Sequence, residues 1–167
     1  MIVIFLDVDG VLVHSDSIGG GRASGEPGGS SFFFAAQIDP ACVARLFRLC
    51  EATGAKLVLA SAWRMHEAQV TGLRRALIAA GFPRRGTLLG RTGTLPGPLD
   101  GPARRAAEIQ AWLDTCSLPG VRPFVLDDGY VPGFPQLNDR PSYFGGGLQD
   151  THLDAALTLL RPSPPSL

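Results

Sequence analysis

Short apolar runs alternate along the chain with longer stretches in which apolar residues recur at helical spacing. Four runs are continuous enough to predict buried strands, at residues 2–6, 56–60, 87–89 and 124–126. The other stretches predict helices that begin near Pro40, His66, Pro102 and Thr151. Strands and helices in this alternation form parallel βαβ units. We therefore expect an α/β fold, a doubly wound and mostly parallel sheet with helices on both faces.

Local signals support the first and the last of these helices. Asp39 followed by Pro40 is typical of a helix start, an N-cap residue before proline at the first helical position, and Gly54 marks the end. Thr151 with Asp154 three residues later predicts a capping box. The helical spacing assigns these side chains to the buried faces: Val43, Leu46, Phe47, Cys50, Val70, Leu73, Leu77, Ala80, Ile109, Trp112, Leu113, Leu153, Ala156, Leu157 and Leu160.

Two segments lack both patterns. Residues 15–37 begin with a stretch rich in glycine and serine and predict a flexible flap or insertion. In it, the run Phe32 to Phe34 forms either the edge strand of a hairpin or the apolar rim of a site entrance. Residues 129–147 predict an irregular loop with a brief strand near Tyr143 and Phe144. We expect residues 1–161 to form a single domain and residues 162–167 a disordered tail.

The composition bears on which partners the chain binds and in which compartment it resides. Fifteen basic and fifteen acidic residues balance, so net charge does not point to nucleic acid or a membrane surface. Between residues 60 and 110, however, eight arginines and three acidic residues leave an excess of five positive charges, which suits an anionic substrate. The alternative is a chain that simply prefers arginine. Three cysteines without a C-x-x-C pair, and an opening apolar run that Asp7 ends early, favour a soluble cytoplasmic protein without a membrane segment.

Acidic residues follow two of the predicted strands. Asp7 and Asp9 leave the first strand on the same side, and Asp127 and Asp128 end the last one. If these strands are neighbours, four carboxylates meet at one edge, where each pair near 4 Å repels by roughly 4 kcal/mol at an effective dielectric of about 20. Such a cluster needs a cation, and oxygen ligands favour Mg²⁺. The alternative is a set of unrelated strand-end aspartates.

Serine and arginine residues stand where a phosphate would be bound. Ser61 ends the second strand, where its hydroxyl and the neighbouring N–H groups suit a phosphate oxygen, although a helix cap is the simpler reading. Arg104 and Arg105 lie in the first turn of their helix, where the helix dipole disfavours positive charge, so an anionic partner is expected. The alternative is a pair of solvated arginines.

Taken in order, FLDVDGVL, LVLASAWR, ARRAAEIQAWL and FVLDD resemble the four motifs of the haloacid dehalogenase (HAD) superfamily of aspartate-nucleophile phosphatases. The resemblance spans residues 2–128. Its closer similarity, through SAWR and LDD, is to the small HAD domains associated with RNA-repair proteins. Two departures stand out: an arginine replaces the more usual lysine, and no further acid follows Asp128 at short spacing.

The resemblance implies a role for each matching residue. Asp7 would attack phosphorus and form an aspartyl-phosphate, and Asp9 would protonate the leaving oxygen and then activate water. Mg²⁺ would be held by Asp7, Asp9 through its backbone carbonyl, Asp127 and Asp128. Ser61 would bind a phosphoryl oxygen. We assign the cation of the phosphate site to Arg105, with Arg104 in reserve, and extend substrate contact to Arg64 as a further prediction. Trp63 and His66 lie on the same loop as Arg64 and could also contact substrate, but a packed Trp63 and a solvated Arg64 are the simpler expectation.

Other classes of protein would carry different sequence patterns. A phosphoacceptor receiver domain would carry its adjacent acid pair on the first strand, and a dinucleotide-binding domain would need G-x-G-x-x-G after it. A HAD-like binding module without catalysis stays open. The short insertion after the first strand leaves an open site that suits a nucleotide or a polynucleotide end, whereas a small phosphorylated metabolite fits if residues 15–34 act as a lid.

Overall fold

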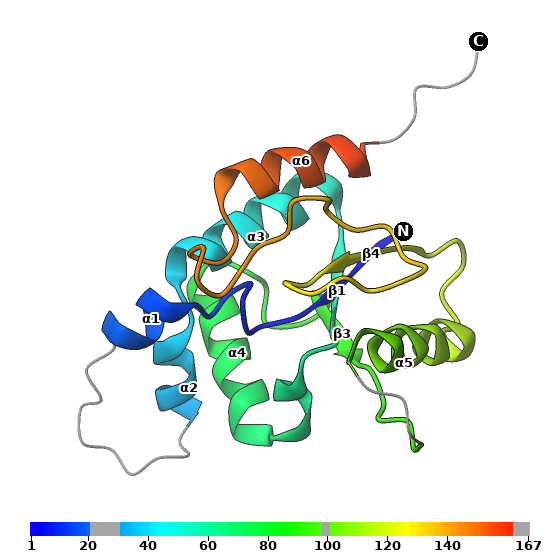
Figure 1. Ribbon diagram of the computed structural model, residues 1–167, viewed down its shortest axis with the longest axis horizontal. Coiled ribbons are helices and arrows are strands. Elements are labelled where there is room, and N and C mark those ends of the chain that lie inside the picture. Colours follow the sequence, from blue (N-terminus) through cyan, green and yellow to red (C-terminus); the bar gives the residue numbers. More distant parts are fainter. Residues whose placement is uncertain (21–30, 98–100, 162–167) are drawn as a thin grey trace.

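Four parallel strands form the centre of the computed structural model, which describes residues 1–20, 31–97 and 101–161. The strands are β1 (Ile2–Leu6), β2 (Lys56–Leu59), β3 (Leu88–Arg91) and β4 (Arg122–Leu126). Their spatial order is β3-β2-β1-β4, and helices surround them (Figure 1). β1 is hydrogen bonded to a neighbour on each side, and all of its residues are buried. The predicted parallel sheet is confirmed.

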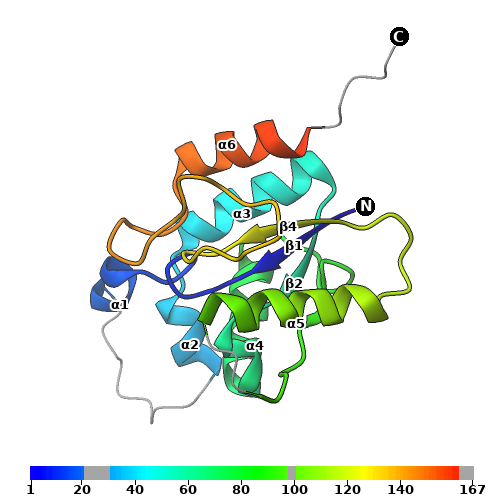
Figure 2. The ribbon, with the colours of Figure 1, turned by 45° about the vertical axis from the view of Figure 1, so that its right-hand side comes forward.

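Alternate residues of the strands pack on opposite faces of the sheet. Ile2, Ile4 and Leu6 enter the larger core, which also contains the apolar stripes of α3 (Pro40–Thr53), α4 (Glu67–Ala79) and α6 (Asp150–Leu160). Val3 and Phe5 turn to the other face and pack with α5 (Gly101–Thr115). Figure 2 shows α5 lying along one face and α3 and α6 on the other. The predicted helices on both faces are therefore confirmed.

The helix ends follow the predicted chemistry at α3 but not at α6. The Asp39 carboxylate accepts a hydrogen bond from the N–H of Ala41 at 2.8 Å, and Gly54 ends α3 with a left-handed φ of 67°. α6 begins one residue before Thr151, and the backbone N–H of Gln149 donates to Nδ1 of His152 at 2.9 Å. The capping box predicted from Thr151 and Asp154 is wrong because His152 supplies the acceptor.

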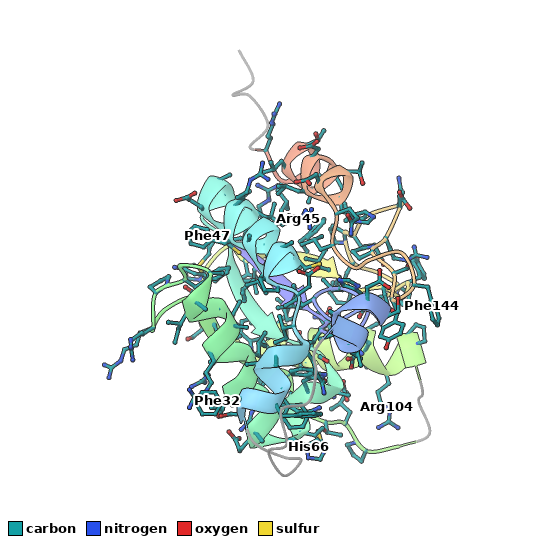
Figure 3. The ribbon with its side chains drawn as sticks, turned by 90° about the vertical axis from the view of Figure 1, so that its left-hand side faces the viewer. Phe32, Arg45, Phe47, His66, Arg104 and Phe144 are labelled. Carbon is teal, nitrogen blue, oxygen red and sulfur yellow. The ribbon has the colours of Figure 1, made fainter. Side chains whose placement is uncertain are left out.

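The loop after β4 contains turns where a brief strand was predicted. The N–H groups of Gly145 and Gly147 both donate to the carbonyl of Ser142, at 3.2 and 3.0 Å, which folds the chain back on itself. The strand predicted near Tyr143 and Phe144 is wrong for this reason. Phe144 lies exposed at the outer edge of the molecule (Figure 3).

Two short helices stand in the segment predicted as a flap, α1 (Ser15–Gly20) and α2 (Ser31–Gln37). The hairpin strand predicted for the three phenylalanines is wrong, because α2 packs closely on α4. A Cβ added to Gly72 would lie 2.8 Å from the Cβ of Phe34 and 2.9 Å from the carbonyl of Ser31, so only glycine permits this approach. Phe32 stays exposed and stacks on Arg75.

Parts of the sequence predictions lie outside the described residues, namely positions 21–30 of the flap and the tail at 162–167. The single domain over residues 1–161 stays a prediction. None of the helices in the described part of the chain combines the length and the apolar character needed to cross a membrane. A 3₁₀ helix, η1 (Ala62–Met65), connects β2 to α4 and brings further residues to the candidate site.

Candidate active site

Asp7 and Asp127 stand side by side at the carboxyl edge of the sheet. Leu6, the last residue of β1, pairs with Leu126, the last residue of β4, so the aspartates that follow them lie next to each other. Both aspartates continue the alternation that turns Phe5 and Val125 toward α5. Since β2 and β3 lie on one side of β1 and β4 on the other, the two carboxylates flank the point where the strand order reverses, which is where ligands bind in such sheets.

Arg105 bridges the two carboxylates from the first turns of α5. Its guanidinium lies 2.6 Å from Oδ2 of Asp127 and 3.3 Å from Oδ1 of Asp7. Burial alone lowers the pKa of Arg105, but the two carboxylates outweigh that effect and raise it, so the group stays charged. Arg104 turns instead to the segment before α5, where it donates to the carbonyls of Leu95 and Gly97 at 2.9 and 2.7 Å (Figure 3). The structure thus places Arg105, and not Arg104, in the acidic cluster.

Asp128 completes a set of three carboxylates that converge. Oxygen atoms of Asp7, Asp127 and Asp128 all lie within 4.8 Å of one another. Gly10 makes room for the third of them: its φ is 79°, and an added Cβ would overlap the carboxylate of Asp128. The glycine of the D-x-D-G sequence is therefore required on two grounds, its left-handed backbone and the close approach of a side chain.

Asp9 lies at the solvent-exposed border of the cluster, and Trp63 holds it there. The indole N–H of Trp63 donates to both carboxylate oxygens of Asp9, at 3.2 Å each. Trp63 itself is buried and packs against Phe34 of α2. The predicted packing of this tryptophan is confirmed, and the packed ring also has a polar contact with a predicted catalytic residue.

Ser61 is a helix cap, which was the simpler expectation for it, and Arg64 lies in the helix that it caps. Ser61 caps η1, where its hydroxyl accepts from the N–H of Trp63 at 3.3 Å, and it is 0% exposed. Arg64 forms an ion pair with Glu108 of α5 at 2.7 Å and donates to the carbonyls of Ala60 and Ser61. The side chains of Arg64 and Glu108 are 9% and 2% exposed. A solvated Arg64, the simpler expectation from the sequence, is therefore wrong, because the side chain belongs to a buried ion pair. The substrate contact considered for Arg64 stays a prediction.

The electrostatics of the cluster favour an added cation. Four ionised carboxylates and the Arg105 guanidinium sum to a charge of minus three. Burial, and then the neighbouring Asp7 charge, raise the pKa of Asp127 to about 6 and also raise the pKa values of Asp9 and Asp128. Three converging carboxylates without nitrogen or sulfur ligands form a hard donor set, which fits Mg²⁺.

Sequence reasoning missed some residues that shape this site. Glu108 went unnoticed because a glutamate inside a helix pattern normally faces solvent, and His14 had no partner pattern. In the structure, Nε2 of His14 lies 2.8 Å from Oδ2 of Asp39, which ties the loop after the site to the start of α3. The one sequence signal for the ion pair of Arg64 with Glu108 was the excess of arginines over acidic residues between residues 60 and 110.

An α/β sheet with a D-x-D-G loop at its switch point and an Asp-Asp pair on the adjacent strand defines a HAD domain. The chain matches the family model described as "HAD domain in Swiss Army Knife RNA repair proteins" over residues 3–158, and it belongs to that family. This membership supports a HAD-type phosphatase in general terms. No curated protein and no solved structure matches the chain in the corresponding comparisons.

Proposed function

We propose that the chain is a Mg²⁺-dependent phosphatase that hydrolyses a phosphate monoester through an aspartyl-phosphate on Asp7. The observation that carries the proposal is the pairing of Asp7 and Asp127 at the switch point of the sheet, bridged by the half-buried guanidinium of Arg105. A nucleophilic carboxylate beside a fixed cation is suited to attack an anionic phosphate, which it would otherwise repel.

The proposed reaction consists of two successive displacements at phosphorus. A carboxylate oxygen of Asp7 forms a bond to phosphorus while the bond to the leaving oxygen breaks, and Asp9 gives its proton to that oxygen. Asp9 then takes a proton from water as the water oxygen attacks the phosphorus, the bond to Asp7 breaks, and inorganic phosphate is released. Asp9 is exposed at the border of the cluster, where it can meet both the leaving group and water.

Asp7, Asp127, Asp128 and the backbone carbonyl of Asp9 would hold Mg²⁺. When bound, the ion supplies positive charge that offsets the charge of the transferring phosphoryl group. Arg105 orients the Asp7 carboxylate and neutralises part of the same charge. Ser61 would bind a phosphoryl oxygen, a role that requires its covering side chains to shift, because its hydroxyl is fully buried.

We favour a nucleotide or a polynucleotide end as the substrate. Support comes from the family description, which refers to RNA repair proteins, and from the excess of arginine between residues 60 and 110. The free thiols of Cys42, Cys50 and Cys116 support a reducing compartment and hence a cytoplasmic location. A small phosphorylated metabolite is the alternative, with α1 and α2 as the start of a cover over the site.

A panel of phosphate esters tests the proposal. We expect Mg²⁺-dependent turnover of an aryl phosphate and, among natural esters, of 3′- or 5′-phosphorylated oligonucleotides in preference to sugar phosphates. Asp7→Asn and chelation should each abolish turnover, and Mg²⁺ should restore the chelated enzyme. Asp154→Asn, an exposed change on α6, serves as the control.

Two outcomes would overturn the enzymatic assignment. One is absence of turnover across the whole panel with Mg²⁺ present, which would leave a HAD-like binding module. The other is an Asp7→Asn variant with full rate, which would show that the hydrolysis arises elsewhere. Preference for sugar phosphates over oligonucleotides would keep the chemistry and replace the substrate class.

A further inference from the structure

Trp63 contacts a predicted catalytic side chain without itself facing the reacting atoms. Its indole N–H lies 3.2 Å from each carboxylate oxygen of Asp9, so the N–H points between the two oxygens. At this length the hydrogen bonds are weak, but together they fix the plane of the carboxylate relative to the ring. A carboxylate offers about four lone-pair directions, so two remain for proton exchange with a substrate.

The ring of Trp63 is held by elements on two sides. Trp63 is 3% exposed, and its backbone N–H is bonded to Ser61 in the cap of η1. Phe34 of α2 meets the ring edge to face, with centroids 5.7 Å apart and an interplanar angle of 69°. Since Gly72 lets α2 approach α4 at backbone contact, the position of Phe34 is itself fixed.

We infer that Trp63 is a positioning residue for the general acid: seated by Phe34 of α2, it orients the Asp9 carboxylate toward the leaving oxygen of the substrate. The inference rests on the proposed function and adds a residue to it. It also connects α2, through Phe34, to the predicted catalytic residue Asp9. Without the indole N–H, the exposed Asp9 side chain would rotate among its rotamers and meet the leaving oxygen less often.

Trp63→Phe tests the inference because it keeps an aromatic ring and removes the N–H. The measurement is kcat/KM, which reports the steps up to release of the leaving group, for two esters of different chemistry. An alkyl phosphate leaves as a poor alkoxide and needs the proton of Asp9, whereas 2,4-dinitrophenyl phosphate leaves readily without it. General acid catalysis contributes typically 10²–10⁴-fold, so we expect a loss of at least about tenfold for the alkyl ester. The loss for the aryl ester should stay within about threefold.

Two matched variants separate positioning from packing. Trp112→Phe makes the same chemical change on α5, where the ring packs against Phe5, and should leave the ratio of the two kcat/KM values unchanged. Phe34→Leu should lower the alkyl value more than the aryl value, by a smaller factor than Trp63→Phe. Phe32→Leu, at the exposed ring on Arg75, should alter neither.

Equal losses with both esters, or no loss with either, would overturn the inference while the phosphatase assignment stands. A wild-type protein that hydrolyses neither of these esters nor any other ester of the panel would instead overturn the proposed function. The hydrogen bond has a test of its own that needs no turnover. The chain has two tryptophans, so its NMR spectrum contains two indole N–H signals, which Trp112→Phe assigns. Asp9→Asn should shift the Trp63 signal alone, and a spectrum in which neither signal moves would refute the contact.

Discussion

The buried pair of Arg64 and Glu108 makes a quantitative prediction about stability. In Arg64→Met, the carboxylate of Glu108 keeps its place at 2% exposure but loses its partner at 2.7 Å. Breaking a buried ion pair by removing one partner costs about 3–5 kcal/mol, a large fraction of the roughly 5–15 kcal/mol that stabilises a typical domain. We therefore expect the free energy of unfolding to fall by about 3–5 kcal/mol.

Removing both charges should restore much of this loss. In Arg64→Met with Glu108→Leu, no buried charge is left unpaired, although the carbonyls of Ala60 and Ser61 still lose a donor. A lost hydrogen bond costs about 1 kcal/mol, so we expect the double variant to recover roughly half of the deficit or more. If removing Glu108 as well restores stability, the loss in the single variant comes from the buried, unpaired carboxylate. Two independent contacts would instead give additive losses.

Urea unfolding at pH 7 measures these differences, and an exposed pair supplies the control. Arg48 and Asp150 are 3.2 Å apart with both side chains 62% exposed, so Arg48→Met should cost less than about 1 kcal/mol. Equal costs for Arg64→Met and Arg48→Met, or a double variant no more stable than the single one, would refute the reasoning. A raised KM with unchanged stability would return Arg64 to a role in substrate binding.

Two further predictions concern glycine and pH. Gly10→Ala and Gly54→Ala both place alanine at a left-handed φ, 79° and 67°. Gly54→Ala should lose about 1–2 kcal/mol in urea unfolding, and Gly10→Ala should lose more, because its Cβ would also meet Asp128. Only Gly10→Ala should weaken Mg²⁺-dependent turnover. Burial raises the pKa of Asp39, but the hydrogen bonds that its carboxylate accepts outweigh this effect and hold the pKa below 3.8. The ionised carboxylate therefore stabilises the fold above pH 3.8, and this contribution is lost as the pH falls through the lower pKa of the folded state. The stability gap between wild type and Asp39→Asn should accordingly shrink below about pH 3.8, and a gap that stays constant from pH 7 to pH 2 would contradict the assignment.

The sheet and the centre of the site could be predicted from sequence because both are local. The apolar run of β1 ends directly at Asp7 and that of β4 at Asp127, so knowing the strands fixes the aspartates. Parallel strands bring their carboxyl ends to one edge, which joins the two pairs without any knowledge of the loops. Arg105 followed from the same kind of reasoning, since it lies one helical turn before the buried Ile109.

The contacts that orient the site could not be predicted, because they join residues distant in sequence through side chains of ordinary type. Trp63 and Asp9 are 54 positions apart, and Arg64 and Glu108 are 44 apart. No spacing rule selects such pairs. The helix at Ser31–Gln37 was missed for a related reason: its neighbouring residues favour a loop, and its close packing against Gly72 of another helix stabilises it.

The alternation of side chains along β1 limits how the chain can change length. Asp7 reaches Arg105 because it shares the face of Val3 and Phe5, and hydrogen bonds to β2 and β4 fix β1 on both edges. One residue inserted before Asp7 would turn its carboxylate toward the α3 face, away from Arg105. β1 can therefore accept substitutions, but changes of length that keep the site intact are confined to the loops. We expect changes of substrate specificity in related chains to arise from the loops around the carboxyl edge of the sheet.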